Sequence, residues 1–149
     1  MLYGRSKDAK RFKKNLFVFL RRLLLFAQAD KVLFDGILLA HLQAWLISMT
    51  TSNWRTMRHA ATLISLHLVQ CLSEIGFHLD KQIHRLDTQL DTMRASERSK
   101  KSNSIKEEKA SHESDMDIVD ESIQDFHDKS LFFFLFSRSE NRKQHGRRR

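Results

Sequence analysis

The side chains in this sequence that could hold a metal ion or act in catalysis are mainly its eight histidines and one cysteine. His67 and Cys71 are four residues apart, so both would lie on one face of a helix. Zinc takes at least three protein ligands, and no third residue is spaced to join this pair. We therefore expect no metal and no cofactor, and we expect Cys71 to be a small buried apolar residue.

The sequence contains no motif for nucleophilic or phosphate-binding chemistry. No H-E-x-x-H, G-x-S-x-G or P-loop pattern occurs, and four glycines are too few to build a phosphate cradle. The most conspicuous polar group is Arg55, Arg58, His59 and Thr62 at the start of an apolar stretch. Arg55 and His59 are four residues apart, and we expect this group to bond to a neighbouring helix end rather than to a ligand. The chain is therefore expected not to be an enzyme and to have no small-molecule substrate.

Basic residues are concentrated near the N-terminus. Residues 1–22 contain eight bases and one acid, within a chain of net charge +8. Contact with the DNA backbone requires a high density of positive charge and no particular motif. Non-specific, salt-sensitive binding of duplex DNA is therefore one interpretation, and a solvated helix face is the other. The candidate DNA-binding residues are Lys7, Lys10, Arg11, Lys14, Arg21 and Arg22.

Composition favours an all-α protein in a reducing compartment. The 149 residues include no proline, whereas β-sandwiches need many turn residues. A single cysteine excludes an intrachain disulfide framework. The length fits one domain or a piece of a larger one. No stretch reaches the roughly 20 apolar residues that span a bilayer, so we expect no membrane partner.

Apolar spacing predicts three helices in the first 98 residues. The first covers residues 7–28 with Ser6 as its N-cap, the second covers 31–49 with Asp30 as its cap, and the third starts near residue 52 and continues as a heptad series to Met93. We expect Gly36 inside the second helix and a break or kink at Gly76. The face of the first helix that we expect to be buried consists of Phe12, Leu16, Phe19, Leu23 and Phe26.

Beyond residue 98 the pattern changes. Residues 99–114 are mostly Ser, Lys, Glu and Asn and are predicted to be a disordered linker or arm tip. Residues 115–129 are predicted to form a short acidic helix that folds back through Met116, Val119, Ile123 and Phe126. Residues 130–149 are an apolar run followed by a basic tail, and they have no amphipathic period.

The segment KVLFDGILLAHLQAWLISMTTSNWRTMRHAATLISLHLVQCLSEI (residues 31–75) resembles the STAG, or stromalin, region of the HEAT-repeat cohesin subunit, in a fungal-like form. The family pattern is an LFD-type helix, an aromatic-rich run ending in small hydroxyl residues, and R-x-x-R-H-T-a-T before an apolar helix. The resemblance extends from about Lys7 to Arg98. Ala60 replaces the threonine usual after Arg-His, and the V-H-R-Y-R-D-like motif that follows the family's helical arm is missing. We therefore expect a truncated STAG-like unit over residues 1–98, followed by a last 20 residues that are not family sequence.

The resemblance implies HEAT-like antiparallel helical layers with a projecting long helix or coiled-coil arm. It also implies a non-catalytic scaffold in sister-chromatid cohesion and chromosome segregation, associated with chromatin in the nucleus. The implied partners are the kleisin subunit, other cohesin components and non-specific duplex DNA. Phe17, Leu24 and Trp45 would remain exposed for neighbouring repeats. Two alternatives stay open: a membrane-surface or mitochondrial protein with a basic amphipathic N-terminal helix, and a generic helical interaction module.

Overall fold

The computed structural model describes the backbone of residues 7–94 and 99–146, and side chains over residues 7–92 and 102–129. Within these residues the regular structure is helical throughout, which confirms the all-α prediction. The expected cap Ser6 and the basic residues 147–149 lie outside the described residues. The elements are α1 (Lys7–Ala29), the 3-10 helix η1 (Val32–Asp35), α2 (Ile37–Thr50), α3 (Arg55–Arg94) and α4 (Ser99–Gly146).

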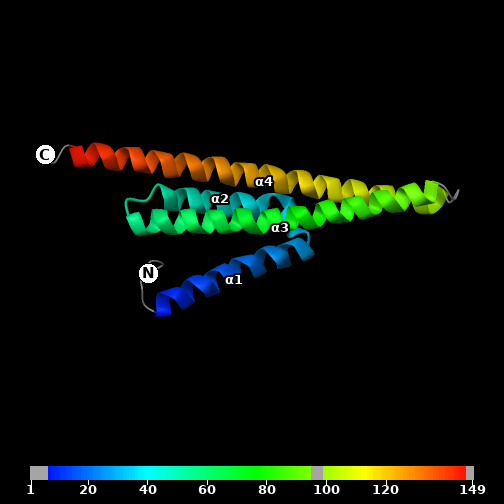
Figure 1. The fold of residues 1–149 in the computed structure, drawn as a ribbon, viewed down its shortest axis with the longest axis horizontal. Coiled ribbons are helices and arrows are strands. Elements are labelled where there is room, and N and C mark those ends of the chain that lie inside the picture. Colours follow the sequence, from blue (N-terminus) through cyan, green and yellow to red (C-terminus); the bar gives the residue numbers. More distant parts are fainter. Residues whose placement is uncertain (1–6, 95–98, 147–149) are drawn as a thin grey trace.

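Successive α-helices run antiparallel, and α3 lies at the centre of the arrangement (Figure 1). It contacts α1 along one side and both α2 and α4 along others. The far halves of α3 and α4 form a hairpin arm that extends beyond α1 and α2 (Figure 1). The helix α1 therefore forms one edge of the molecule, and α4 forms the opposite edge.

The main core is built around α3, whose buried residues recur every three or four positions. Because this spacing follows the helical repeat, one broad face of α3 can pack against three neighbours. Leu24 of α1, Leu33 of η1 and Val119 of α4 are all fully buried in this core. The buried core residues of α3 in this cluster are Ala61, Ile64, Leu68, Cys71, Leu72, Ile75 and Leu79.

The hairpin arm has a small apolar cluster of its own. Leu86 and Leu90 of α3 are buried together with Ile105 of α4. Beside this cluster, the ammonium of Lys109 donates to the carboxylate of Asp87 across the two helices. These contacts hold the two helices of the arm together.

Residues 99–114 differ from the sequence prediction, because the structure shows them as the start of α4 rather than as a disordered linker. The predicted acidic helix over 115–129 is the middle of the same helix. Its spaced apolar residues do face the core: Val119 and Phe126 are buried, and Met116 and Ile123 pack against them. This polar segment can form a helix because it packs against α3, where Ile105 is buried between the two helices.

Both glycine expectations need correction. The predicted helix over 31–49 is divided, because Gly36 has φ +72° and joins η1 to α2. Glycine adopts this left-handed conformation at no steric cost. By contrast, α3 is one continuous helix through Gly76. There, α4 passes close by, and a Cβ on Gly76 would lie 3.6 Å from a methyl carbon of Val119.

The buried face of α1 is not the one that spacing predicted. Leu20, Leu24 and Ala27 are buried against the core, whereas Phe19 and Phe26 are 60% and 70% exposed. Leu24, which we expected to be exposed, is therefore fully buried. The apolar sector of α1 is wider than the contact with α3, so the structure covers only part of it.

Among the described residues, the helix α3 is more apolar than we expected of any stretch of the sequence. An 18-residue window within Arg55–Thr92 has a mean hydropathy of 1.4, so by length and composition α3 could cross a membrane. The expectation that no stretch is apolar enough is therefore wrong on this measure. However, 44% of the window is buried inside the structure, and a central core helix has the same composition.

Candidate functional site

The candidate DNA-binding residues all lie on α1, and all are exposed. Spacings of three, four and seven residues place Lys7, Lys10 and Lys14 along one side of this helix. Around the helix, Arg11 and Arg22 lie between these lysines and the exposed phenylalanines. The helix carries a single acid, Asp8. This edge of the molecule therefore presents a positive surface that is nearly free of carboxylates.

Within this group of described residues, Arg21 is the one for which the structure shows an ion-pair partner. Its guanidinium lies 2.9 Å from the carboxylate of Glu74 on α3. Both side chains are about half exposed, so the pair is screened by water and contributes little to stability. Arg21 is therefore less available to an external anion than its neighbours.

A stack of three side chains joins α1 to α3 next to this ion pair. The rings of Phe17 and His67 are stacked with their centroids 4.3 Å apart. The ammonium of Lys13 lies 5.5 Å from the centre of the Phe17 ring. A ring nitrogen of His67 is also 3.0 Å from the Phe17 carbonyl oxygen. This histidine is thus an interhelix contact.

His67 and Cys71 do lie together, with the sulfur 3.7 Å from the imidazole Nε2. Burial raises the pKa of the Cys71 thiol, with a smaller contribution from the nearby Glu74 carboxylate. A protonated thiol is a poor nucleophile and a poor metal ligand. Among the described residues, no group of three potential ligands is close enough to hold a metal ion.

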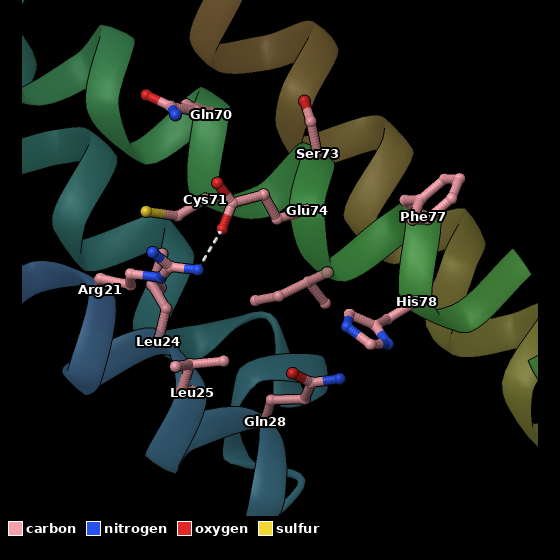
Figure 2. Close-up of a pocket in the computed structure, with 11 residues that line it drawn as sticks. Arg21, Leu24, Leu25, Gln28, Gln70, Cys71, Ser73, Glu74, Phe77 and His78 are labelled. Carbon is pink, nitrogen blue, oxygen red and sulfur yellow. Dashed lines mark ion pairs between the residues drawn. The ribbon is translucent and has the colours of Figure 1, made fainter. Parts of the chain in front are cut away.

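A groove of about 730 Å³ runs between α1 and α3. Figure 2 shows the Arg21–Glu74 ion pair at one side of this groove, with Leu24 and Leu25 of α1 facing α3. Its lining mixes apolar side chains with amides and one imidazole, that of His78. These groups suit contact with another protein surface, and among them we find no nucleophile activated by a base.

The residues of the sequence motif lie at the start of α3. The Arg58 guanidinium donates to the carbonyl oxygens of Ser52 and Asn53, at 2.8 and 3.1 Å. The Thr62 hydroxyl donates to the carbonyl of Arg58 at 3.0 Å. Arg58 thus joins α3 to the loop after α2. Arg55 and His59 are exposed on the first turns of the helix.

A second, acidic groove of about 360 Å³ separates η1 and α2 from α4. Gln43 donates to the Asp125 carboxylate at 3.2 Å, and Lys129 donates to it at 2.9 Å. The hydrogen bond from Lys129, followed by that from Gln43, lowers the pKa of Asp125. Asp35 and Glu121 also line this groove, so the molecule has an acidic edge opposite the basic one.

The sequence did not predict two of these contacts between helices, namely the Phe17–His67 stack and the Gln43–Asp125 hydrogen bond. Each joins residues 50 or more positions apart, and no local spacing relates them. Helical periodicity gives the face of a side chain but not its partner on another helix.

A family model described as the STAG domain matches residues 1–114 of the chain. The match includes α1, η1, α2, α3 and the first part of α4, and hence the whole basic surface and the Arg58 contacts. No curated protein matches the chain.

Proposed function

The chain belongs to the STAG domain family, and from this premise we propose that it is a non-catalytic scaffold unit that binds duplex DNA through α1. The STAG domain is typical of scaffold proteins associated with cohesin. We propose that the chain takes part in sister-chromatid cohesion and chromosome segregation, at chromatin in the nucleus. Its partners would be the kleisin subunit, other cohesin components and duplex DNA. The HEAT-like stacking of its helices against further repeats belongs to the same proposal.

The observation that supports DNA binding most directly is the basic surface of α1. Lys7, Lys10 and Lys14 are exposed side by side, and Arg11 and Arg22 extend the surface. Basic side chains on an exposed helix can contact phosphates, and phosphate contacts carry no sequence information. Binding should therefore be non-specific, and its affinity should fall steeply as the salt concentration rises.

An electrophoretic mobility shift on a random-sequence duplex, repeated over a salt series, tests the proposal. The variant carries Lys7→Glu, Lys10→Glu and Lys14→Glu. We expect the affinity of the variant to fall by about tenfold or more, and the salt dependence of binding to become shallower by about one unit for each lost phosphate contact. Arg21 is left unchanged because a glutamate in its place would face Glu74 and add like-charge repulsion between α1 and α3.

The matched control carries the same change of net charge elsewhere on the surface, with Lys81→Glu, Arg85→Glu and Lys106→Glu on the hairpin arm. All three side chains are exposed. If DNA binding depends on where the basic residues lie and not only on net charge, the affinity of this control for DNA should be within about twofold of that of the unchanged chain. Equal loss of binding in both variants, or no shift at low salt, would contradict the proposal.

Kleisin binding is tested separately, because it does not require the basic surface. The exposed side chain of Trp45, 53% accessible on α2, is the candidate contact. Co-purification of the chain with a kleisin segment should survive the three α1 substitutions and weaken in Trp45→Ala. If the kleisin segment fails to co-purify at all, this partner is wrong.

A further inference from the structure

The helix α1 carries an apolar stripe whose three phenylalanines are left exposed by the rest of the described structure. We call it the aromatic seam, and it consists of Phe12, Leu16, Phe19, Leu23 and Phe26. Its three phenylalanines are 54%, 60% and 70% exposed. Leu16 packs partly against the core, and Leu23 is half-buried. Three large exposed aromatic rings in one line are unusual for a free surface and indicate an interaction site.

The spacing within the aromatic seam indicates what kind of structure covers it. Its members follow one another at intervals of four, three, four and three residues, which is the core spacing of a coiled coil. A second helix can insert its apolar side chains between residues spaced in this way. Phe12 and Phe26 are 14 positions apart, or roughly 21 Å along the helix axis at 1.5 Å per residue. The matching partner is therefore a helix of about four turns.

Charge on the same helix indicates the chemistry of that partner. Arg11 and Arg22 lie on the solvent side of the aromatic seam, and Lys7, Lys10 and Lys14 are further around α1. Asp8 is the single acid on the helix. A second copy of this chain that docked through its own α1 would bring two such basic helices together, which like-charge repulsion disfavours. A helix with acidic residues beside its apolar stripe has complementary charge.

We propose that the aromatic seam is a docking site for an amphipathic helix of a partner protein, one with apolar residues at three- and four-residue spacing and acidic flanks. This inference goes beyond DNA binding and does not depend on it. The phenylalanines are on the side of α1 away from Lys10 and Lys14, and Arg11 and Arg22 lie between the two groups.

The test uses the full chain and a synthetic four-heptad peptide with Leu at both core positions and Glu at both flanking positions. Glutamates on both flanks oppose self-pairing of this peptide. Fluorescence anisotropy of the labelled peptide measures its affinity. Phe19→Ala combined with Phe26→Ala should weaken binding by about tenfold or more, as loss of buried aromatic anchors does at interfaces. Circular dichroism should be unchanged, because both rings are exposed.

Two controls make the result specific to the seam. Phe77→Ala removes a phenylalanine of similar exposure, 69%, from α3, and it should leave the affinity within about twofold of the unchanged chain. Arg11→Glu combined with Arg22→Glu keeps the aromatic rings but should weaken binding of the acidic peptide. A peptide with Lys at the flanking positions should bind the unchanged chain poorly.

Several results would overturn the proposal. One is equal loss of affinity in the Phe77 variant, and another is no loss in the seam variants. Self-association of the chain that Phe19→Ala abolishes would identify a second copy as the occupant. Release of the peptide by phosphatidylserine vesicles that bind the seam would identify a lipid surface. Since the phenylalanines lie apart from the lysines, Phe19→Ala combined with Phe26→Ala should bind DNA normally, whereas Arg11→Glu combined with Arg22→Glu should weaken DNA binding as well. Loss of DNA binding alone leaves this proposal standing.

Discussion

At the scale of single residues, Arg58 is the side chain whose contacts organise the start of α3. It donates to two carbonyl oxygens in the loop after α2, and hydrogen bonds from a charged donor are stronger than neutral ones. We expect Arg58→Ala to lower the free energy of unfolding by about 1–2 kcal/mol. Urea denaturation measures this change.

The matched control for that prediction is Arg55→Ala. Arg55 is one turn earlier on the same helix and exposed, so its removal should change stability by less than about 0.5 kcal/mol. Equal effects of the two substitutions would show that the loop contacts of Arg58 contribute no more to stability than an exposed arginine does.

Cys71 provides a second test at this scale. Its side chain is 4% exposed, and burial raises its pKa. Because both access and ionisation are reduced, we expect a disulfide reagent at pH 8 to label the folded chain at least a hundredfold more slowly than the chain in guanidinium, an order-of-magnitude estimate for a buried neutral thiol. The raised pKa of Cys71 also affects how the stability of the chain depends on pH. The unfolded chain loses the thiol proton first, so this group lowers stability as the pH rises above its ordinary pKa. Rapid labelling of the folded chain would show that the α1–α3 contact opens readily.

At the scale of helices, Gly36 and Gly76 should respond in opposite ways to the same substitution. Gly76 lies within α3, where a Cβ would make an ordinary contact with Val119. Gly76→Ala should therefore stabilise the chain by about 0.5–1 kcal/mol, since alanine is the better helix former. Gly36 has φ +72°, so Gly36→Ala should destabilise it by about 1–2 kcal/mol. Thermal unfolding of both variants tests the pair, and a destabilised Gly76→Ala would mean that α3 and α4 pack more closely than the structure indicates.

The helices themselves could be predicted from the sequence, but their partners could not. Three- and four-residue spacing identified α3 and the apolar residues of α4. It failed for α1, where apolar residues occupy about half of the circumference and spacing alone does not choose between two adjacent faces. The choice depends on contacts from α3, such as the stacking of His67 on Phe17. It failed again at residues 99–114, because a polar helix is stable only with α3 beside it.

The same reasoning explains what the sequence could say about the candidate site. Exposure of the lysines on α1 follows from charge, since a buried lysine needs a partner. The aromatic seam was found as a pattern but assigned to the core. Only the placement of α1 on α3 shows that Leu20, Leu24 and Ala27 take that role and leave the phenylalanines at the surface.

At the scale of the whole molecule, the family match and the folded unit do not end at the same residue. The match ends at residue 114, whereas the described core includes Val119 and Phe126 of α4, which are 0% and 3% exposed. Met116 and Ile123 pack against the same cluster. A chain that ends at residue 114 would therefore leave one face of α3 uncovered.

The cost of that truncation can be compared with the stability of an ordinary domain. Full burial of one large apolar side chain contributes about 1.5–3 kcal/mol, so loss of Val119 and Phe126 removes about 3–6 kcal/mol. Loss of the partly buried Met116 and Ile123 adds to this. Small domains have a total of about 5–15 kcal/mol. We therefore expect residues 1–114 to lack a cooperative unfolding transition in urea. Residues 1–129, which retain all four side chains, should unfold cooperatively. A cooperative transition in the shorter chain would mean that α4 beyond residue 114 is not needed to complete the core, and that the family match alone marks the folded unit.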